Sequence, residues 1–183
     1  MYKITSYKYI NNNAKNTVLY LHGWGCNLNY MLPLIDGVSN WNCLIIDLPG
    51  FGKNKGFDTP KNFEEIANII LTFIKENSFD INYIVGHSFG GKLAAFLSTK
   101  LSIKSIFLFA PSIYNKPRFL SYYIKIYFYK LLKKMLPNTK LLNRFGSKDY
   151  KSLDNVMKTT MSNVINYKMN PILKNIKCDV FLF

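Results

Sequence analysis

The chain has 183 residues, of which 49% are hydrophobic, enough for one globular domain with a substantial core. No uncharged apolar run reaches the roughly 18 residues of a membrane-spanning helix, and the N-terminal MYKITSYKYINNN lacks a signal-peptide core, so we expect a cytoplasmic protein. The net charge of +14 is concentrated in residues 111–183, where nearly all the basic residues are Lys and no nucleic-acid-binding module accompanies them, so we expect a solvated surface and no nucleic-acid partner.

Six stretches of the chain predict β-strands. The first, YKITSYKYI at 2–10, predicts an antiparallel strand or hairpin at a sheet edge. The other five are TVLYL (17–21), CLIIDL (43–48), INYIV (81–85), IKSIFLF (103–109) and CDVFLF (178–183). These five are continuously apolar rather than alternating, which is typical of parallel strands that are covered on both faces.

Helical stretches separate these strands. TPKNFEEIANIILTFIKENS (59–78) predicts a helix with Thr59 as its N-cap and Pro60 in its first turn. Its apolar residues form one helical stripe: Phe63, Ile66, Ala67, Ile70, Phe73 and Ile74. GGKLAAFLSTKL (90–101) predicts the next helix. The alternation of strands and helices predicts the α/β class, with an open parallel sheet and right-handed crossovers.

A long helical segment then interrupts this alternation. It contains RFLSYYIKIYFYKLLKKMLP (118–137) and SLDNVMKTTMSNVINYKM (152–169). An insertion of this kind predicts a lid over the strand ends, with ordinary core helices as the alternative, and its aromatic residues and lysines are also compatible with contact to a membrane surface. We therefore expect a first core part (1–111), a helical lid or cap insertion (112–170), and a return to the core (171–183).

The stretch GHSFGGKL at 86–93 follows a strand and opens a helix, and two chemistries use such a turn. Gly86, Gly91 and Lys92 satisfy most of the phosphate-loop pattern G-x-x-x-x-G-K-[ST]. Leu93, however, replaces the hydroxyl that would hold Mg²⁺. The Asp-x-x-Gly element DLPG also precedes this loop, whereas in GTPases it follows. Nucleotide hydrolysis is therefore disfavoured.

The second chemistry is nucleophilic catalysis by Ser88. In G-x-S-x-G the serine occupies a sharp strand-to-helix turn, and Gly86 and Gly90 leave room for the tight backbone. The start of the new helix aims backbone N–H groups at the reacting oxygen. LHGWG, at 21–25, ends the first parallel strand and would bring a second such N–H to the site.

LHGWG, DLPGFG and GHSFGG, in this order and at these spacings, resemble the α/β-hydrolase fold family, particularly its small serine esterase or lipase-like members. The resemblance implies a mostly parallel α/β-hydrolase sheet with crossover helices and a helical lid after the family's sixth strand. It also implies an acyl-enzyme reaction on a small ester, thioester or amide, without cofactor or metal. Ser88 would be the nucleophile, the backbone N–H groups of Trp24 and Phe89 the oxyanion hole, and Asp47 structural. The supporting motif residues are His22, Gly23, Gly25, Gly86, His87, Gly90 and Gly91.

The general base is the open question. In this family the chain order is Ser, then acid, then His, but both histidines of this sequence, His22 and His87, precede Ser88. We expect both histidines to be structural. Three later carboxylates also have positions unsuited to catalysis: Asp149, Asp154 and Asp179.

The final segment, NPILKNIKCDVFLF, resembles the lead-in to the family's seventh strand. We therefore expect a C-terminally truncated fragment that lacks the final strand and helix, with the catalytic acid and histidine beyond Phe183. Such a fragment would be inactive or nearly so. The alternatives are a non-catalytic binding protein of the same fold and a membrane-surface lipase. The identity of the substrate and the oligomeric state stay open.

Overall fold

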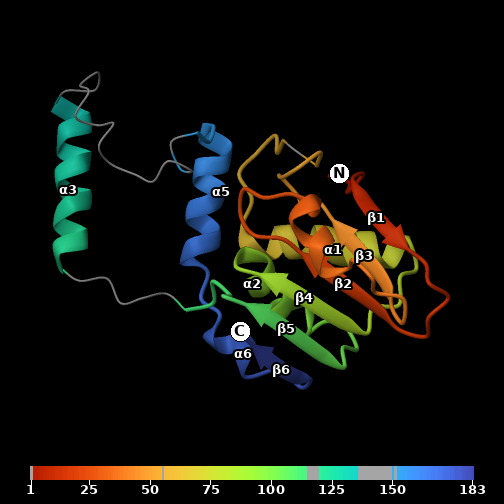
Figure 1. Cartoon of the computed structure of the whole chain (residues 1–183). Coiled ribbons are helices and arrows are strands. Elements are labelled where there is room, and N and C mark those ends of the chain that lie inside the picture. Colours follow the sequence, from red (N-terminus) through yellow and green to blue (C-terminus); the bar gives the residue numbers. More distant parts are fainter. Residues whose placement is uncertain (1, 55, 115–119, 136–149, 151) are drawn as a thin grey trace.

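The computed structural model describes all residues except 1, 55, 115–119, 136–149 and 151. Its centre is one six-stranded sheet with the spatial order β1-β3-β2-β4-β5-β6 (Figure 1). The strands are β1 (Tyr7–Ile10), β2 (Thr17–Leu21), β3 (Asn42–Ile46), β4 (Tyr83–His87), β5 (Ser105–Phe109) and β6 (Asp179–Leu182).

The topology confirms the predicted α/β class. β1 pairs antiparallel with β3 at one edge of the sheet, and every other neighbouring pair is parallel. β2, β4 and β5 therefore have their carboxyl ends on the same side of the sheet, where Leu21 pairs with Gly86 and His87 pairs with Phe109. The loops that follow these strands meet beyond their carboxyl ends, as they do in other open α/β sheets.

Two long helices cover one face of the sheet. They are α1 (Phe63–Glu76) and α2 (Phe89–Leu97). All six residues of the predicted apolar stripe of α1 are buried, and they join the core beneath β2, β3 and β4. The other face carries a smaller cluster around η1, a 3-10 helix at Leu28–Leu34 that the sequence reading did not anticipate. The sheet is thus the middle layer of the molecule.

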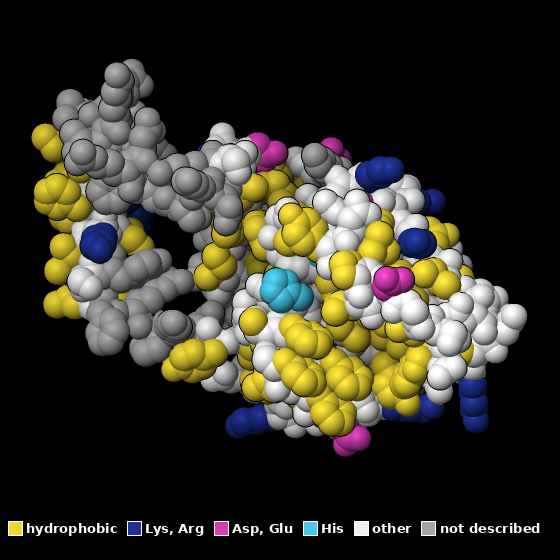
Figure 2. All heavy atoms as spheres, viewed as in Figure 1, with side chains coloured by type: hydrophobic (Ala, Val, Ile, Leu, Met, Phe, Trp, Pro, Cys, Tyr) yellow, Lys and Arg dark blue, Asp and Glu magenta, His cyan; other side chains and the backbone are white. Residues whose placement is uncertain are grey.

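Part of this second face remains open to solvent. A groove of about 290 Å³ runs over the sheet, and Figure 2 shows hydrophobic side chains gathered in this region. The groove is lined by Val18, Tyr20, Leu34, Val38, Trp41, Tyr83, Val85, Phe107, Phe109 and Phe183. At the edge of the sheet, the rings of Phe181 in β6 and of Phe183 just after it stack flat on Phe107 and Phe109 of β5, and all four residues of β6 are exposed. The edge strand therefore presents apolar side chains to solvent.

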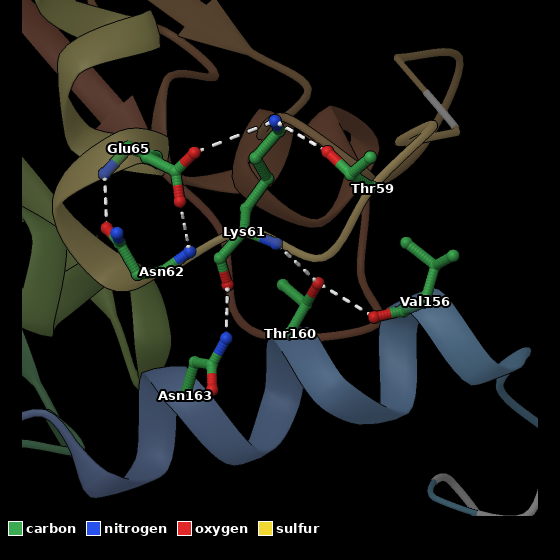
Figure 3. Close-up of polar contacts among 7 residues, drawn as sticks. All are labelled: Thr59, Lys61, Asn62, Glu65, Val156, Thr160 and Asn163. Atoms are coloured by element: carbon green, nitrogen blue, oxygen red, sulfur yellow. Dashed lines mark hydrogen bonds and ion pairs between the residues drawn. The ribbon is translucent and has the colours of Figure 1, made fainter.

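The start of α1 differs from the expectation. Asn62, not Thr59, is the N-cap, and Pro60 lies outside the helix. Asn62 accepts a hydrogen bond from the Glu65 backbone N–H (2.8 Å), and the Glu65 carboxylate accepts one from the Asn62 N–H (2.7 Å), as Figure 3 shows. This reciprocal capping box satisfies two backbone donors at once, which explains why the helix starts at Phe63.

Between residues 112 and 173, the described part of the chain forms two helices and a short turn of helix. These are α3 (Leu120–Met135), α5 (Asn155–Asn166) and α6 (Asn170–Leu173). α5 docks on the loop before α1, where the Thr160 hydroxyl accepts from the Lys61 N–H (3.0 Å) and Asn163 donates to the Lys61 carbonyl (3.2 Å) (Figure 3). Helices thus occur where the sequence predicts them, while their function as a lid stays a prediction.

Candidate active site

Ser88 occupies the turn between β4 and α2 in a backbone conformation that few non-glycine residues adopt, with φ 52° and ψ −110°. Its N–H donates to the Phe109 carbonyl (2.9 Å), and its own carbonyl accepts from Ser112 N–H (3.0 Å). These two bonds, through the backbone N–H and the carbonyl of Ser88, hold the strained turn against the end of β5. Ser88 is half-buried, and its hydroxyl forms no capping hydrogen bond with α2.

The glycines of this turn are required by close backbone approach. A Cβ on Gly90 would lie 2.1 Å from the Leu21 carbonyl oxygen, and a Cβ on Gly86 would lie 2.5 Å from the Gly90 carbonyl oxygen. A Cβ on Gly91 would lie 2.8 Å from the Cβ of Pro111. α2 can therefore start directly against the ends of β2 and β4 only because these positions lack side chains.

The loop after β2 lies directly against Ser88. A Cβ on Gly23 would be 3.0 Å from His87 Nδ1 and 3.6 Å from Ser88 Cβ. The next residue of this loop, Trp24, and the first residue of α2, Phe89, each have a backbone N–H that donates to no acceptor within the described residues. Two uncommitted donors thus flank Ser88, as stabilisation of an oxyanion requires.

Aromatic packing fixes this loop. The Trp24 ring lies 4.8 Å from that of Phe51 and 5.3 Å from that of Phe89, between centroids, in edge-to-face geometry. Gly25 follows with φ +76°, which turns the chain away from the sheet. The loop is thus attached to α2 through its own aromatic side chain.

His22 is fully buried and has both ring nitrogens engaged. Nε2 accepts from the Leu48 backbone N–H (2.9 Å), so Nδ1 carries the proton and donates to the Gly23 carbonyl (2.8 Å). Burial lowers the pKa of His22, although the bond to Gly23 and the Asp47 carboxylate oppose this shift. The ring therefore stays neutral and ties the loop to the end of β3, and it has no free nitrogen to act as a base.

His87 precedes Ser88 directly and is exposed. Its ring packs against Gly23, and no hydrogen bond joins it to the Ser88 hydroxyl in the described structure. The later carboxylates are no closer to the chemistry: Asp154 caps α5 by accepting from Met157 N–H (2.7 Å), and Asp179 starts β6 opposite Ser105, at the far end of the strands. Asp149 lies outside the described residues.

Asp47 is buried at the end of β3 and accepts three hydrogen bonds. They come from the Ser6 hydroxyl (2.6 Å), the Leu28 N–H (2.7 Å) and the Lys53 N–H (2.8 Å). With its acceptor positions occupied by groups from three segments, this carboxylate fixes the loops around the site and is not available to orient a base.

Lys92 has a role that the sequence reading missed. Its side chain is only 1% exposed, and the ammonium donates to the carbonyls of Val164 (2.7 Å) and Tyr167 (3.1 Å) at the carboxyl end of α5. Burial lowers the pKa of Lys92 to about 8. Since the ammonium points into the interior, it cannot hold a phosphate, and this geometry removes the phosphate-loop alternative.

Comparisons with known proteins bear on the fold of the chain. A sequence profile described as "alpha/beta hydrolase fold" matches residues 16–160. Over 83 residues the chain is 31% identical to the dihydrolipoyllysine-residue acetyltransferase component of the acetoin cleaving system of Cupriavidus necator, a match to 45% of this chain and 22% of that protein. It is also 31% identical over 83 residues to the pimeloyl-[acyl-carrier protein] methyl ester esterase of Proteus mirabilis, covering 45% of this chain and 30% of the esterase.

Among solved structures, a lipase-esterase related protein from Clostridium acetobutylicum superposes with a TM-score of 0.65 at 21% identity. The match covers 97% of this chain and 79% of that structure. At this identity the likeness shows a shared fold. The matches span less than a third of the length of the two curated relatives, at 22% and 30%.

Proposed function

The chain belongs to the alpha/beta hydrolase fold family, and on that premise we propose that it is part of a serine hydrolase that acts on a small ester-like substrate through an acyl-enzyme. The observation that carries this proposal is the conformation of Ser88 (φ 52°, ψ −110°), held beside two uncommitted backbone N–H groups. Strain of this size, about 1–3 kcal/mol, persists where function requires it.

In the proposed reaction the Ser88 oxygen attacks the carbonyl carbon of an ester, thioester or amide. The hydroxyl proton passes to a general base, and the carbonyl oxygen becomes an oxyanion that accepts from the N–H groups of Trp24 and Phe89. Collapse of this intermediate releases the protonated leaving group and leaves an acyl group on Ser88. Water then hydrolyses the acyl-enzyme, which releases the acid product and restores the free hydroxyl of Ser88.

The general base has no candidate among the described residues, because both nitrogens of His22 are engaged and His87 packs against Gly23. The proposal therefore assigns the base and its carboxylate partner to polypeptide outside these 183 residues. It follows that the 183 residues alone would acylate slowly. Removing the base from a triad leaves the oxyanion hole and substrate binding to supply the residual rate.

The proposed substrate class rests on the relatives. One is named a methyl ester esterase and another an acetyltransferase component, and both names describe transfer of an acyl group. The absence of a base within the described residues favours a second candidate, a binding protein of the same fold without catalysis. The two differ in whether Ser88 forms a covalent acyl intermediate.

The experiment is acylation by an activated p-nitrophenyl ester, with added imidazole as an external base. The hydrolase proposal expects release of p-nitrophenol to increase with imidazole beyond the rate without protein, and the Ser88→Ala variant to lose this increase. Ser112→Ala is the matched control, since Ser112 contacts Ser88 only through its backbone N–H. Equal rates for wild type and Ser88→Ala would favour the binding protein.

A further inference from the structure

The outer face of α3 carries a continuous apolar stripe. Six large side chains recur at spacings of three or four residues, and each is between 40% and 75% exposed. They are Leu120, Ile124, Tyr127, Phe128, Leu131 and Met135. Residues at these spacings lie on the same side of a helix, so the stripe is one surface rather than a set of scattered side chains.

Positive charge accompanies this stripe. Lys125, Lys130 and Lys134 are exposed on the same helix, and the sequence from 120 to 135 contains no acidic residue. Residues 111–183 as a whole hold 14 basic and three acidic residues. A partner for this helix must therefore offer negative charge at its surface and apolar material directly beneath it.

The setting of α3 limits what that partner can be. In Figure 1 α3 stands apart from the sheet and from α5, and Figure 2 shows its hydrophobic side chains with Lys side chains among them. A protein partner would have to supply a matching groove, whereas a lipid surface accepts a convex amphipathic helix of any shape.

The length of α3 decides between lying on a membrane and crossing it. Its 16 residues span about 24 Å, less than the roughly 30 Å of a bilayer's hydrocarbon core. No helix within the described residues is long and apolar enough to cross a membrane. We propose that α3 docks in the plane of an anionic lipid surface, with its stripe in the acyl-chain boundary and its lysines at the headgroups.

The test is co-sedimentation of the whole chain with two kinds of vesicle, phosphatidylcholine alone and phosphatidylcholine mixed with phosphatidylglycerol. We expect binding to the anionic vesicles only. Ile124→Ser/Phe128→Ser removes part of the stripe, and Lys130→Gln/Lys134→Gln removes two charges. The lysine pair should weaken binding about 10- to 30-fold, since each lysine near an anionic surface contributes about 1 kcal/mol. The stripe pair should weaken binding at least as much, because two large apolar side chains no longer enter the acyl-chain boundary.

Lys8→Gln/Lys100→Gln is the matched control, because it removes the same net charge from exposed positions away from α3. It should bind like the wild type, and so should Ser88→Ala, which makes this inference independent of the proposed function. Loss of binding in the control pair would reveal a general charge effect and overturn the proposal. So would binding to a single-stranded RNA homopolymer in place of vesicles, or a dimer abolished by the stripe variant without any vesicle binding.

Discussion

The buried ammonium of Lys92 donates to the backbone carbonyl of Val164 across 2.7 Å, and so joins the helix that follows Ser88 to the end of α5. The rings of Phe63 and Tyr167 lie 5.3 and 5.8 Å from this nitrogen, between Nζ and the ring centroids. A positive charge at the carboxyl end of a helix is stabilised by the helix dipole. Lys92 thereby connects α2, α1 and α5 around one buried charge.

Replacing Lys92 by Met is expected to loosen α5. The methionine fills the space but leaves the carbonyls of Val164 and Tyr167 without the lysine as donor, at a cost of about 1–3 kcal/mol. Amide hydrogen exchange across Asn155–Asn166 should accelerate about tenfold or more, while β2 and β4 stay protected. Lys100→Met, an exposed position after the same helix, is the control. Equal exchange in both variants would show that Lys92 does not hold α5.

The same lysine predicts a pH dependence. Burial lowers its pKa from 10.5 to about 8, so between these values the unfolded chain keeps a proton that the folded chain has lost. The contribution of Lys92 to the free energy of unfolding therefore rises with pH through this range and is lost as the pH falls through about 8. The Glu64 carboxylate on α1 accepts a hydrogen bond from the Tyr167 hydroxyl (2.7 Å).

Urea unfolding of wild type and Lys92→Met measures this effect. The free energy of unfolding of the wild type, relative to that of Lys92→Met, should increase by about 2 kcal/mol from about pH 7.5 to about pH 9.5. Other groups titrate in this range as well, but they do so in both proteins and cancel in the difference. A difference that is constant with pH would contradict the lowered pKa.

Gly90→Ala should be strongly destabilising. Its Cβ would lie 2.1 Å from the Leu21 carbonyl oxygen, and the other nearest atoms are also backbone atoms of Leu21 and His22, so no flexible side chain can move away. We expect a loss on the order of 3 kcal/mol or more in the free energy of unfolding. Gly37→Ala is the control. Gly37 has φ +72° but open space around it, so we expect a loss of only about 1 kcal/mol in the free energy of unfolding. Similar losses in the two variants would argue against the close approach.

The capping box at α1 gives a smaller effect. Asn62→Ala removes the side chain that accepts from Glu65 N–H and should cost about 1 kcal/mol in urea unfolding. Thr59→Ala should change stability by only a few tenths of a kcal/mol, because Thr59 lies outside the helix. A larger loss of stability in Thr59→Ala than in Asn62→Ala would show that Thr59 is the cap.

Much of the fold follows from the sequence because its patterns are local. Continuous apolar runs predict the parallel strands, and TVLYL coincides with β2 from Thr17 to Leu21. The stripe from Phe63 to Ile74 predicts the buried face of α1 in full. The glycines around Ser88 predict the tight turn, since a side chain there meets backbone. These features depend on neighbours a few residues apart.

Other features depend on contacts between distant segments. The two donors that Lys92 offers to α5 join residues more than 70 positions apart, and only the surrounding apolar sequence GGKLAAF hinted at burial. The helix η1 contains Pro33 and has no clear apolar period, so its sequence does not predict a helix. The predicted cap Thr59 was wrong because Asn62 forms a reciprocal pair of hydrogen bonds with Glu65, which places the start of the helix three residues later.

The most direct test of the account is covalent labelling of Ser88. A fluorophosphonate probe reacts with an activated serine, and peptide mass spectrometry identifies the residue that carries it. We predict slow labelling at Ser88 that accelerates when imidazole is added and disappears in Ser88→Ala. A folded chain in which Ser88 stays unlabelled with imidazole, or in which other serines label equally fast, would contradict its role as a nucleophile.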